Sequence, residues 1–177
     1  LDDLAGEFPR RAAAGELGVS PETACAGLRT FEGVGRRFQI RKKRGITLLQ
    51  DYAHHPTEIR ALLQAARALQ ARRIWLVFQP HRFSRTRHLL SEFAQAFHGA
   101  DRLALLPVYA ASELPEQGKE SGALAELCRA SFPEVRVFSD RASLLDVWVP
   151  KVGEGELVLI VGAGDIEHLQ EEWLQRL

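Results

Sequence analysis

Short apolar runs alternate with longer amphipathic stretches from about residue 36 onward, and this alternation restricts the possible folds more than any other feature of the chain. The apolar runs are residues 46–50, 74–78, 103–108, 135–138 and 157–161. They are continuously apolar, as expected of strands that are covered on both faces. Each run is followed by a helical stretch, so the sequence predicts a doubly wound, mostly parallel α/β sheet.

The helical stretches carry apolar side chains at the spacing of one helix face. The clearest stripes are Ile59, Leu62, Leu63, Ala66 and Leu69, then Leu89, Leu90, Phe93 and Phe97, and finally Ile166, Leu169, Trp173 and Leu177. Two further elements are expected before the sheet. Ser20 and Pro21 are typical of a helix start, and residues 37–51 predict a hairpin that turns through residues 43–45.

The composition is that of an ordinary globular protein, and it narrows the possible partners. Lys+Arg and Asp+Glu each number 23, so no net field favours nucleic acid or an anionic membrane. The apolar runs are too short to span a bilayer, and the N-terminus lacks the regions of a signal peptide. Cys25 and Cys128 lie far apart, which indicates a reducing cytosol rather than a disulfide framework. The sequence contains no methionine, so we expect a piece of a longer protein.

Three polar segments come directly after three of the predicted strands. They are residues 51–55 (Asp-Tyr-Ala-His-His), 79–87 (Gln-Pro-His-Arg-Phe-Ser-Arg-Thr-Arg) and 162–165 (Gly-Ala-Gly-Asp). The carboxyl ends of parallel strands meet at one edge of a sheet, where open α/β folds bind their ligands. We therefore expect a functional site in which these segments converge.

The second polar segment has the features of an anion site. Ser84 is expected to cap the following helix, so that Arg85 and the free N–H groups of the first turn face one ligand. Arg82 can reach the same position, and two guanidinium groups suit a carboxylate or phosphate. A solvated basic helix start is the simpler alternative. A cationic first turn opposes the helix dipole unless an anion is bound, which favours the functional interpretation.

The two adjacent histidines differ in what their positions indicate. His55 precedes a Pro-Thr-Glu segment that looks like a helix start, so a capping role explains it as well as a functional one. His54 lies closer to the strand end and is the better candidate for chemistry. A metal site of Asp51, His54 and His81 would suit zinc or manganese. No close ligand pair such as His-x-x-x-His supports that site.

The third polar segment is a weaker signal. Gly162 and Gly164 do not form a Gly-x-Gly-x-x-Gly pattern, and glycines after a strand often serve close strand–helix packing. Asp165 would act as the N-cap of the last helix without any further role. The phosphate-binding pattern Gly-x-x-x-x-Gly-Lys-Ser/Thr occurs nowhere in the sequence. A nucleotide would therefore need its phosphates held elsewhere.

Four segments, taken together, match a known family. They are residues 51–58 (Asp-Tyr-Ala-His-His-Pro-Thr-Glu), 78–87 (Phe-Gln-Pro-His-Arg-Phe-Ser-Arg-Thr-Arg), 108–111 (Val-Tyr-Ala-Ala) and 162–166 (Gly-Ala-Gly-Asp-Ile). The chain resembles the Mur ligases of peptidoglycan synthesis, and the first two segments are specific for the branch that adds L-alanine. The resemblance covers only the C-terminal part of such an enzyme. It implies that residues 1–33 are the helical tail of a central ATPase domain and residues 34–177 a Rossmann-like C-terminal domain.

This resemblance implies an ATP-dependent ligase that adds L-alanine to UDP-N-acetylmuramate in the cytoplasm, with Mg²⁺ as a cofactor. In that family an acyl phosphate forms on the muramyl carboxylate, and the amine of L-alanine then attacks it. The UDP-sugar and the phosphates of ATP would be held mainly by N-terminal and central domains that this chain lacks. The chain by itself is therefore expected to be inactive.

The site residues of the family carry over onto matching positions of this sequence. Arg37 and Asp51 would contact the nucleotide. The residues that would surround the incoming alanine are Tyr52, His54, His81, Arg82, Arg85, Gly162 and Gly164. Among them His54, Arg82 and Arg85 would be catalytic, with the arginine pair binding the alanine carboxylate and placing the amine against the acyl phosphate.

The sequence departs from the family at two places. Relatives carry a His-Asn-x-x-Asn segment that contacts adenine and ribose, whereas residues 1–8 contain no asparagine, and Gln50 stands where aspartate is common. Two other functions remain open. One is a non-catalytic α/β module that binds a small carboxylate or a nucleotide through the arginines. The other is a metal-dependent hydrolase that uses Asp51, His54 and His81.

Overall fold

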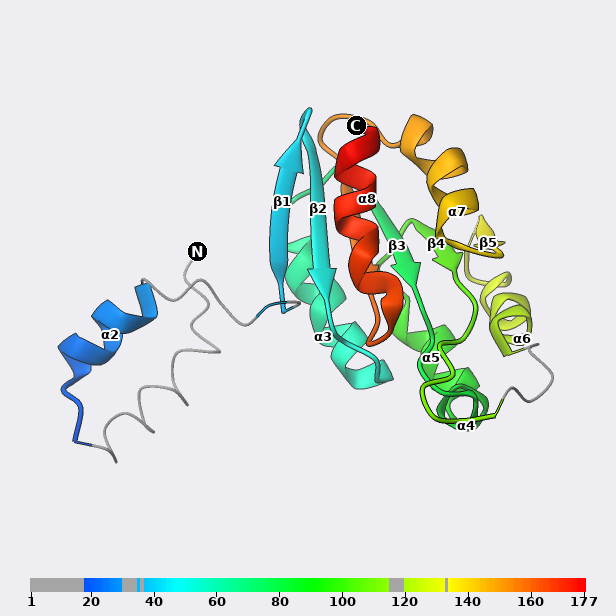
Figure 1. The fold of residues 1–177 in the computed structure, drawn as a ribbon, viewed down its shortest axis with the longest axis horizontal. Coiled ribbons are helices and arrows are strands. Elements are labelled where there is room, and N and C mark those ends of the chain that lie inside the picture. The colour runs from blue at the N-terminus through cyan, green and yellow to red at the C-terminus, as the bar shows by residue number, and fades with distance from the viewer. Residues whose placement is uncertain (1–17, 30–34, 36, 115–119, 133) are drawn as a thin grey trace. The chain divides into compact units, whose positions relative to one another are not determined.

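The computed structural model describes residues 18–29, 35, 37–114, 120–132 and 134–177 (Figure 1). In chain order the elements are α2 (Pro21–Arg29), β1 (Gln39–Lys43), β2 (Ile46–Asp51), α3 (Pro56–Arg67), β3 (Ile74–Phe78), α4 (Phe83–His88), α5 (Leu90–Ala96), β4 (Arg102–Leu105), α6 (Glu120–Cys128), β5 (Val135–Val137), α7 (Arg141–Trp148), η1 (Val149–Lys151), β6 (Leu157–Val161), η2 (Asp165–His168) and α8 (Leu169–Arg176). None of the helices within these residues has the length and apolar character needed to cross a bilayer.

The chain divides into two compact units, Leu1–Val34 and Gly35–Leu177. In the first unit the predicted helix start at Ser20 and Pro21 is confirmed. The Ser20 Oγ accepts the backbone N–H of Thr23 at 3.2 Å, which satisfies one free donor of the first turn of α2. The rest of the helical tail that we expect over residues 1–33 lies largely outside the described residues.

The second unit is built on a six-stranded sheet with the strand order β1-β2-β6-β3-β4-β5 (Figure 1). β1 pairs antiparallel with β2, and the other neighbouring strands are parallel. β6 is the last strand in the sequence but lies between β2 and β3. The predicted doubly wound, mostly parallel α/β sheet with an N-terminal hairpin is therefore confirmed.

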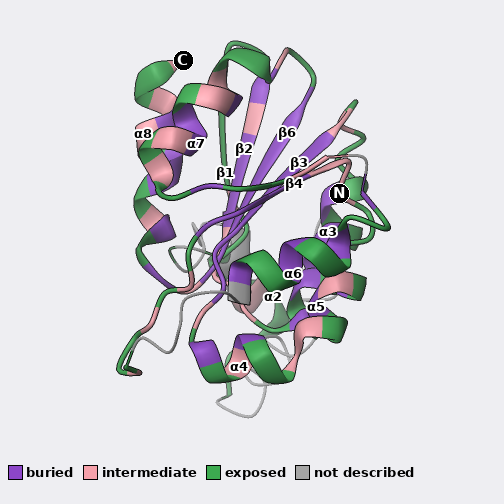
Figure 2. Ribbon diagram, turned by 90° about the vertical axis from the view of Figure 1, so that its right-hand side faces the viewer, coloured by how far each residue is buried: buried purple, intermediate pink, exposed green. Residues whose placement is uncertain are grey.

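Helices cover both faces of this sheet, as Figure 2 shows, with α3, α5 and α6 on one face and α7 and α8 on the other. Every residue of β3 and β6 is buried, which explains why these runs are continuously apolar. Successive side chains of a strand point to opposite faces. Leu76 and Phe78 accordingly join the core under α3, α5 and α6, whereas Trp75 and Val77 join the core under α7 and α8.

The predicted hairpin turns at Arg44 and Gly45, whose φ values are 50° and 73°. A two-residue turn with two positive φ values matches the right-handed twist of the paired strands, and glycine adopts such a conformation with little strain. Lys43 pairs with Ile46 immediately beside this turn. The hairpin prediction is confirmed, with a tighter turn than expected.

Two predicted elements differ from the structure. The run over residues 103–108 forms a strand only to Leu105. After that residue the chain lies beside the residues that come directly after β3. The Tyr109 N–H donates to the Pro80 carbonyl at 2.8 Å, and the Arg82 N–H donates to the Tyr109 carbonyl at 2.8 Å. The helical stretch before β4 is two helices, α4 and α5, that meet at Leu89, where φ and ψ are −115° and 22°.

Candidate active site

The three predicted polar segments do meet at one edge of the sheet. The strand register places Asp51, Val161 and Phe78 side by side at the ends of β2, β6 and β3. β2 and β3 lead to helices on one face of the sheet, whereas β6 leads to α8 on the other face. The crevice between strand ends that diverge in this way is where open α/β sheets bind ligands.

The carboxylate of Asp51, at the end of β2, accepts hydrogen bonds from the backbone before β1 and from the backbone after β2. Its Oδ2 accepts the N–H of Phe38 and its Oδ1 accepts the N–H of Ala53, each at 2.8 Å. The guanidinium of Arg37, next to Phe38, lies 5.9 Å from the centre of the Tyr52 ring. Asp51 thus fixes the start of the hairpin, which keeps Arg37 close to the end of β2.

His54 packs edge-on against Tyr52, with ring centres 5.4 Å apart. Its Nδ1 lies 3.1 Å from the Tyr52 carbonyl oxygen. A carbonyl can only accept, so this contact assigns the proton of the neutral ring to Nδ1 and leaves the lone pair on Nε2. His55 is the N-cap of α3 and forms a capping box with Glu58, which confirms its predicted capping role.

Glu58 holds both histidine backbones at the start of α3. Its Oε2 accepts the N–H of His54 at 2.9 Å and the N–H of His55 at 3.0 Å. Burial acts to raise the pKa of Glu58, but these two hydrogen bonds and the nearby imidazoles bring the pKa below its ordinary value. A charged Glu58 therefore stabilises the segment that presents His54.

His81 lies at the centre of the cluster. Its ring is 6.0 Å from that of His54 and stacks on that of Tyr109 at 5.6 Å. Arg85 Nη1 donates to His81 Nδ1 at 3.4 Å. Burial, followed by the charges of Arg85, His54 and Arg82, lowers the pKa of His81. His81 is therefore neutral at pH 7, with Nδ1 as an acceptor and Nε2–H as a donor.

The prediction that Ser84 caps α4 is wrong. The N-cap is Arg82, with φ and ψ of 70° and 135°, and Ser84 lies inside the first turn. A carboxylate of the chain itself satisfies this turn: the Ser84 N–H donates to Glu113 Oε2 at 3.1 Å, and the Ser84 hydroxyl donates to Glu113 Oε1. The dipole argument for a bound anion therefore loses its force, although Arg82 and Arg85 remain beside His81.

Gly162 and Gly164 are needed for close packing. A Cβ on Gly162 would lie 2.9 Å from the Gln79 carbonyl oxygen, and one on Gly164 would lie 2.5 Å from Tyr109 Cγ. Asp165 does not cap the last helix as predicted, because the chain enters it through η2 with Gly164 as the N-cap. Its Oδ1 instead accepts from the Gln79 amide at 2.7 Å.

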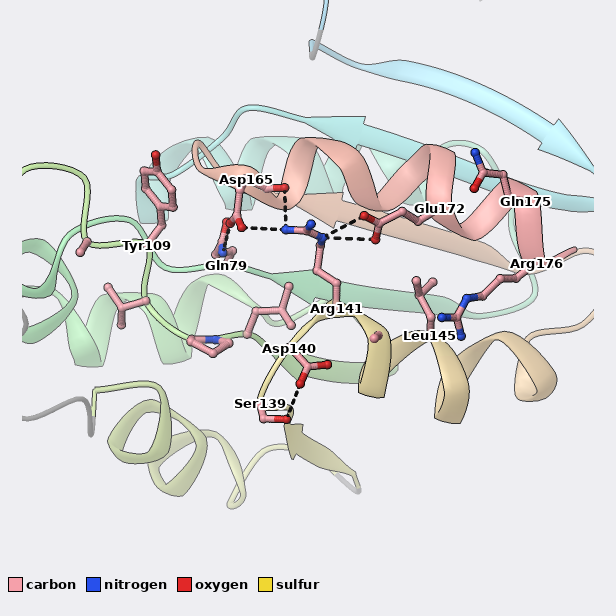
Figure 3. Close-up of a pocket in the computed structure, with 15 residues that line it drawn as sticks. Gln79, Tyr109, Ser139, Asp140, Arg141, Leu145, Asp165, Glu172, Gln175 and Arg176 are labelled. Atoms are coloured by element: carbon pink, nitrogen blue, oxygen red, sulfur yellow. Dashed lines mark hydrogen bonds and ion pairs between the residues drawn. The ribbon is translucent and has the colours of Figure 1, made fainter.

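A cavity of about 690 Å³, with Tyr109 in its wall, lies at the carboxyl ends of β3 to β6 (Figure 3). Arg141 crosses it and donates to Asp165 Oδ2 at 2.7 Å and to Glu172 Oε2 at 3.2 Å. Burial acts to lower the pKa of Arg141, but Glu172 and Asp165 raise it overall. Asp140 and Arg176, which also line the cavity, contact Ser143 and Asp146. The guanidinium of Arg141 is thus already paired with two carboxylates of the cavity wall, Asp165 and Glu172.

Sequence reasoning missed Glu113 and Arg141 as contributors to this edge, and it included Gln79 and Tyr109 only as members of longer segments without roles of their own. All four follow strands that end there, so the position of a residue after a predicted strand is the signal that would have found them. Among the described residues, no three His, Cys, Asp or Glu side chains form a group that could hold a metal ion. The zinc or manganese site of Asp51, His54 and His81 therefore has no support.

Comparisons with known proteins identify a family and a fold for the chain. Residues 36–164 match the family described as Mur ligase, glutamate ligase domain. The chain is 46% identical over 168 residues to a UDP-N-acetylmuramate–L-alanine ligase from Solibacter usitatus. The alignment covers 94% of the chain and 36% of that relative. The chain is 44% identical over 168 residues to the same-named ligase from Geotalea daltonii, covering 94% of the chain and 37% of that relative. The chain thus spans little more than a third of these relatives.

Solved structures show the same relationship. UDP-N-acetylmuramate–alanine ligase from Thermotoga maritima aligns with a TM-score of 0.76 and 30% identity, over 93% of this chain and 35% of that one. A murein peptide ligase from Psychrobacter arcticus aligns with a TM-score of 0.67 and 26% identity, over 93% of this chain and 34% of that one. The family match extends over most of the sheet domain and the folds agree, so the chain belongs to the Mur ligase family and corresponds to the C-terminal domain of its members.

Proposed function

We propose that this chain is the C-terminal domain of a cytoplasmic, ATP-dependent ligase that joins L-alanine to UDP-N-acetylmuramate in peptidoglycan synthesis. The observation that carries the proposal is the cluster of His54, His81 and Arg85 at the carboxyl edge of the sheet. This cluster lies in a chain that is 46% identical to a ligase with that name. UDP-N-acetylmuramate and most of ATP are held by parts of the enzyme outside this chain.

Arg82 and Arg85 bind the carboxylate of the incoming alanine. Both belong to the start of α4, and the charges of both lower the pKa of His81, so both guanidinium groups lie near His81. A carboxylate held by two guanidinium groups is fixed in orientation as well as in position. Tyr52 and the neutral His81 complete the wall of this subsite, and His81 Nε2–H is a further donor. Gly162 and Gly164 contribute by letting the last loop pack against Tyr109 and Gln79.

His54 accepts the proton that alanine must lose before it can react. An ammonium group has no lone pair, so the nitrogen can attack the acyl phosphate only after deprotonation. The Tyr52 carbonyl fixes the ring proton of His54 on Nδ1, which leaves Nε2 as the basic atom. The neutral nitrogen then attacks the acyl carbon, and the bond between that carbon and the phosphate oxygen breaks. Inorganic phosphate leaves with the second proton of the nitrogen, which gives the amide. The muramyl carboxylate receives that phosphate from ATP in the preceding step.

Arg37 and Asp51 contact the nucleotide. The guanidinium of Arg37 lies over the Tyr52 ring, 5.9 Å from its centre, which supports a role beside the end of β2. The carboxylate of Asp51 already accepts two backbone N–H groups but keeps lone pairs for a ribose hydroxyl. The Mg²⁺ that accompanies ATP belongs, in this proposal, mainly to the ATPase part of the enzyme.

The purified chain and the longest product of its gene test this function. With UDP-N-acetylmuramate, L-alanine and MgATP, we expect L-alanine-dependent ADP release from the longer product and none from residues 1–177 alone. Turnover by the chain alone would contradict the proposal, and so would ATP hydrolysis by the longer product that ignores L-alanine. The second candidate function, a binding module that uses the arginines without chemistry, predicts calorimetric binding of L-alanine or ATP and no turnover in either protein.

A further inference from the structure

Glu113 makes contacts that neither the sequence motifs nor the proposed chemistry explains. It lies in the segment after β4, and its carboxylate accepts two hydrogen bonds from Ser84 in the first turn of α4. The Glu113 backbone N–H donates to the Ala110 carbonyl at 3.0 Å, so a tight turn carries the side chain. The hydroxyl and N–H of Ser84 lower the pKa of Glu113 below its ordinary value, which keeps the carboxylate charged at neutral pH.

The backbone at Arg82 is the second observation. A non-glycine residue with φ of 70° is uncommon, and such a conformation persists only where its surroundings hold it. The Arg82 N–H donates to the Tyr109 carbonyl at 2.8 Å. Its carbonyl accepts the N–H of Thr86 at 3.1 Å and the hydroxyl of Thr86 at 2.8 Å. The turn is therefore held at both ends, by the segment after β4 and by α4.

Glu113 connects the two parts that hold this turn. It belongs to the segment that contains Tyr109, and it binds the helix turn that contains Ser84. The same segment stacks Tyr109 on His81, and the same helix aims Arg85 at His81. The Glu113 contact therefore adds a side-chain link between α4 and this segment to the backbone hydrogen bond between Arg82 and Tyr109.

We propose that Glu113 is a positioning residue, which clamps α4 to the segment after β4 and so fixes the turn that presents His81, Arg82 and Arg85. Its assignment to alanine binding rests on the proposed function, whereas the clamp itself does not. The carboxylate also lies close enough to Arg82 and His81 for their charges to interact. It therefore acts as a counter-ion for the cluster while no substrate carboxylate is bound.

NMR spectroscopy of the whole 177-residue chain tests the clamp. E113Q keeps the side-chain shape but removes the charge and one acceptor, and E126Q on α6 is the matched control because Glu126 pairs only with Arg129 among the contacts described for the chain. In E113Q we expect the amide resonances of Arg82, Ser84 and Thr86 to shift together. We also expect the His81 imidazole to titrate at lower pH, since a nearby negative charge is lost. Changes confined to Ser84, or identical spectra for both variants, would overturn the clamp.

Kinetics of the longest gene product test the consequence for alanine. E113Q should raise the apparent KM for L-alanine about tenfold and leave kcat and the KM for ATP within about twofold. S84A should have a similar effect. The apparent KM for L-alanine of the double variant should not exceed that of E113Q, because both changes break the same contact between Ser84 and Glu113. Additive losses, or unchanged alanine kinetics, would overturn the positioning role. An unmodified protein without alanine-dependent activity would instead contradict the proposed function and leave the NMR result standing.

Discussion

Arg82 and Arg85 stand beside a neutral histidine, with one carboxylate of the chain, Glu113, close to them. Replacing both arginines with alanine in the longest gene product should raise the apparent KM for L-alanine by about thirtyfold or more, because a buried substrate carboxylate would lose its partners. The KM for ATP should change far less. Steady-state kinetics with each substrate varied in turn measures both, and R60A on the exposed side of α3 is the control. Equal effects on both substrates would reject the assignment.

His81 should make the stability of the chain depend on pH. Its pKa in the folded chain is below the ordinary value of 6.5, so the unfolded state binds the proton more readily. Stability is therefore lost as the pH falls below about 6.5, and the loss is complete below the folded-state pKa. H81Q should lose less stability than the unmodified chain between pH 7.5 and pH 5.0, measured by urea unfolding.

A control separates this effect from general acid sensitivity. His98 contacts Phe132 rather than the arginine cluster, so H98Q should retain the decline of the unmodified chain. If H81Q and the unmodified chain declined in parallel, the environment described for His81 would be incorrect.

The sequence predicted individual site residues to a useful extent. It placed His54, His81 and Arg85 at one edge, because the carboxyl ends of parallel strands meet there regardless of side-chain detail. It missed the pairing of Ser84 with Glu113 and of Gln79 with Asp165, which join residues 29 and 86 positions apart. Local pattern made Ser84 and Asp165 look like helix caps, and only the tertiary fold brings their true partners to them.

The loop after β6 packs closely against the segments that follow β3 and β4. Gly164→Ala would place a Cβ 2.5 Å from Tyr109 Cγ and 2.7 Å from Gln79 Oε1, so Tyr109 or the loop must shift. We expect a loss of about 2 kcal/mol in the free energy of unfolding. Gly122→Ala in α6 is the matched control, since nothing lies within 4 Å of its new Cβ.

Opposite signs are expected for these two substitutions. G122A should gain about 0.5–1 kcal/mol, because alanine restricts the unfolded chain and favours the helix. Urea unfolding of both variants gives the two values. A G164A variant as stable as the unmodified chain would show that the loop does not need the close approach of Tyr109.

Elements were predicted best where both faces of a strand are buried. The runs that became β3 and β6 are apolar at every position, and their predicted bounds agree with the structure. The predicted run ends at residue 108, whereas β4 ends at Leu105. Leu106 is apolar and buried like a strand residue, so its side chain does not mark the end of the strand. Its N–H nevertheless donates to the Phe78 carbonyl at 3.0 Å, where the chain starts to follow the extension of β3. An apolar run in a sequence indicates that a segment is buried, but it does not indicate the direction in which the chain leaves the sheet.

On the scale of the whole molecule, one sheet supports both apolar cores. The strands β2, β3, β4 and β6 each contribute side chains to both layers, so neither core can form without the sheet that they share. Residues 35–177 should therefore unfold as one cooperative unit. The chain divides into units of residues 1–34 and 35–177, and we propose a domain boundary between residues 33 and 34.

Deleting residues 1–33 tests that boundary. The free energy of unfolding of residues 34–177 should match that of the unmodified chain within about 0.5 kcal/mol, since independent units do not share stabilising contacts. Deleting residues 1–45 is the contrasting variant. It removes β1, which pairs with β2 from Gln39 to Lys43 and accepts the Gln170 side-chain amide at the Gln39 carbonyl, 3.1 Å away. That variant should unfold at lower urea concentration or fail to fold. If the shorter deletion were equally destabilising, the first 33 residues would belong to the sheet domain.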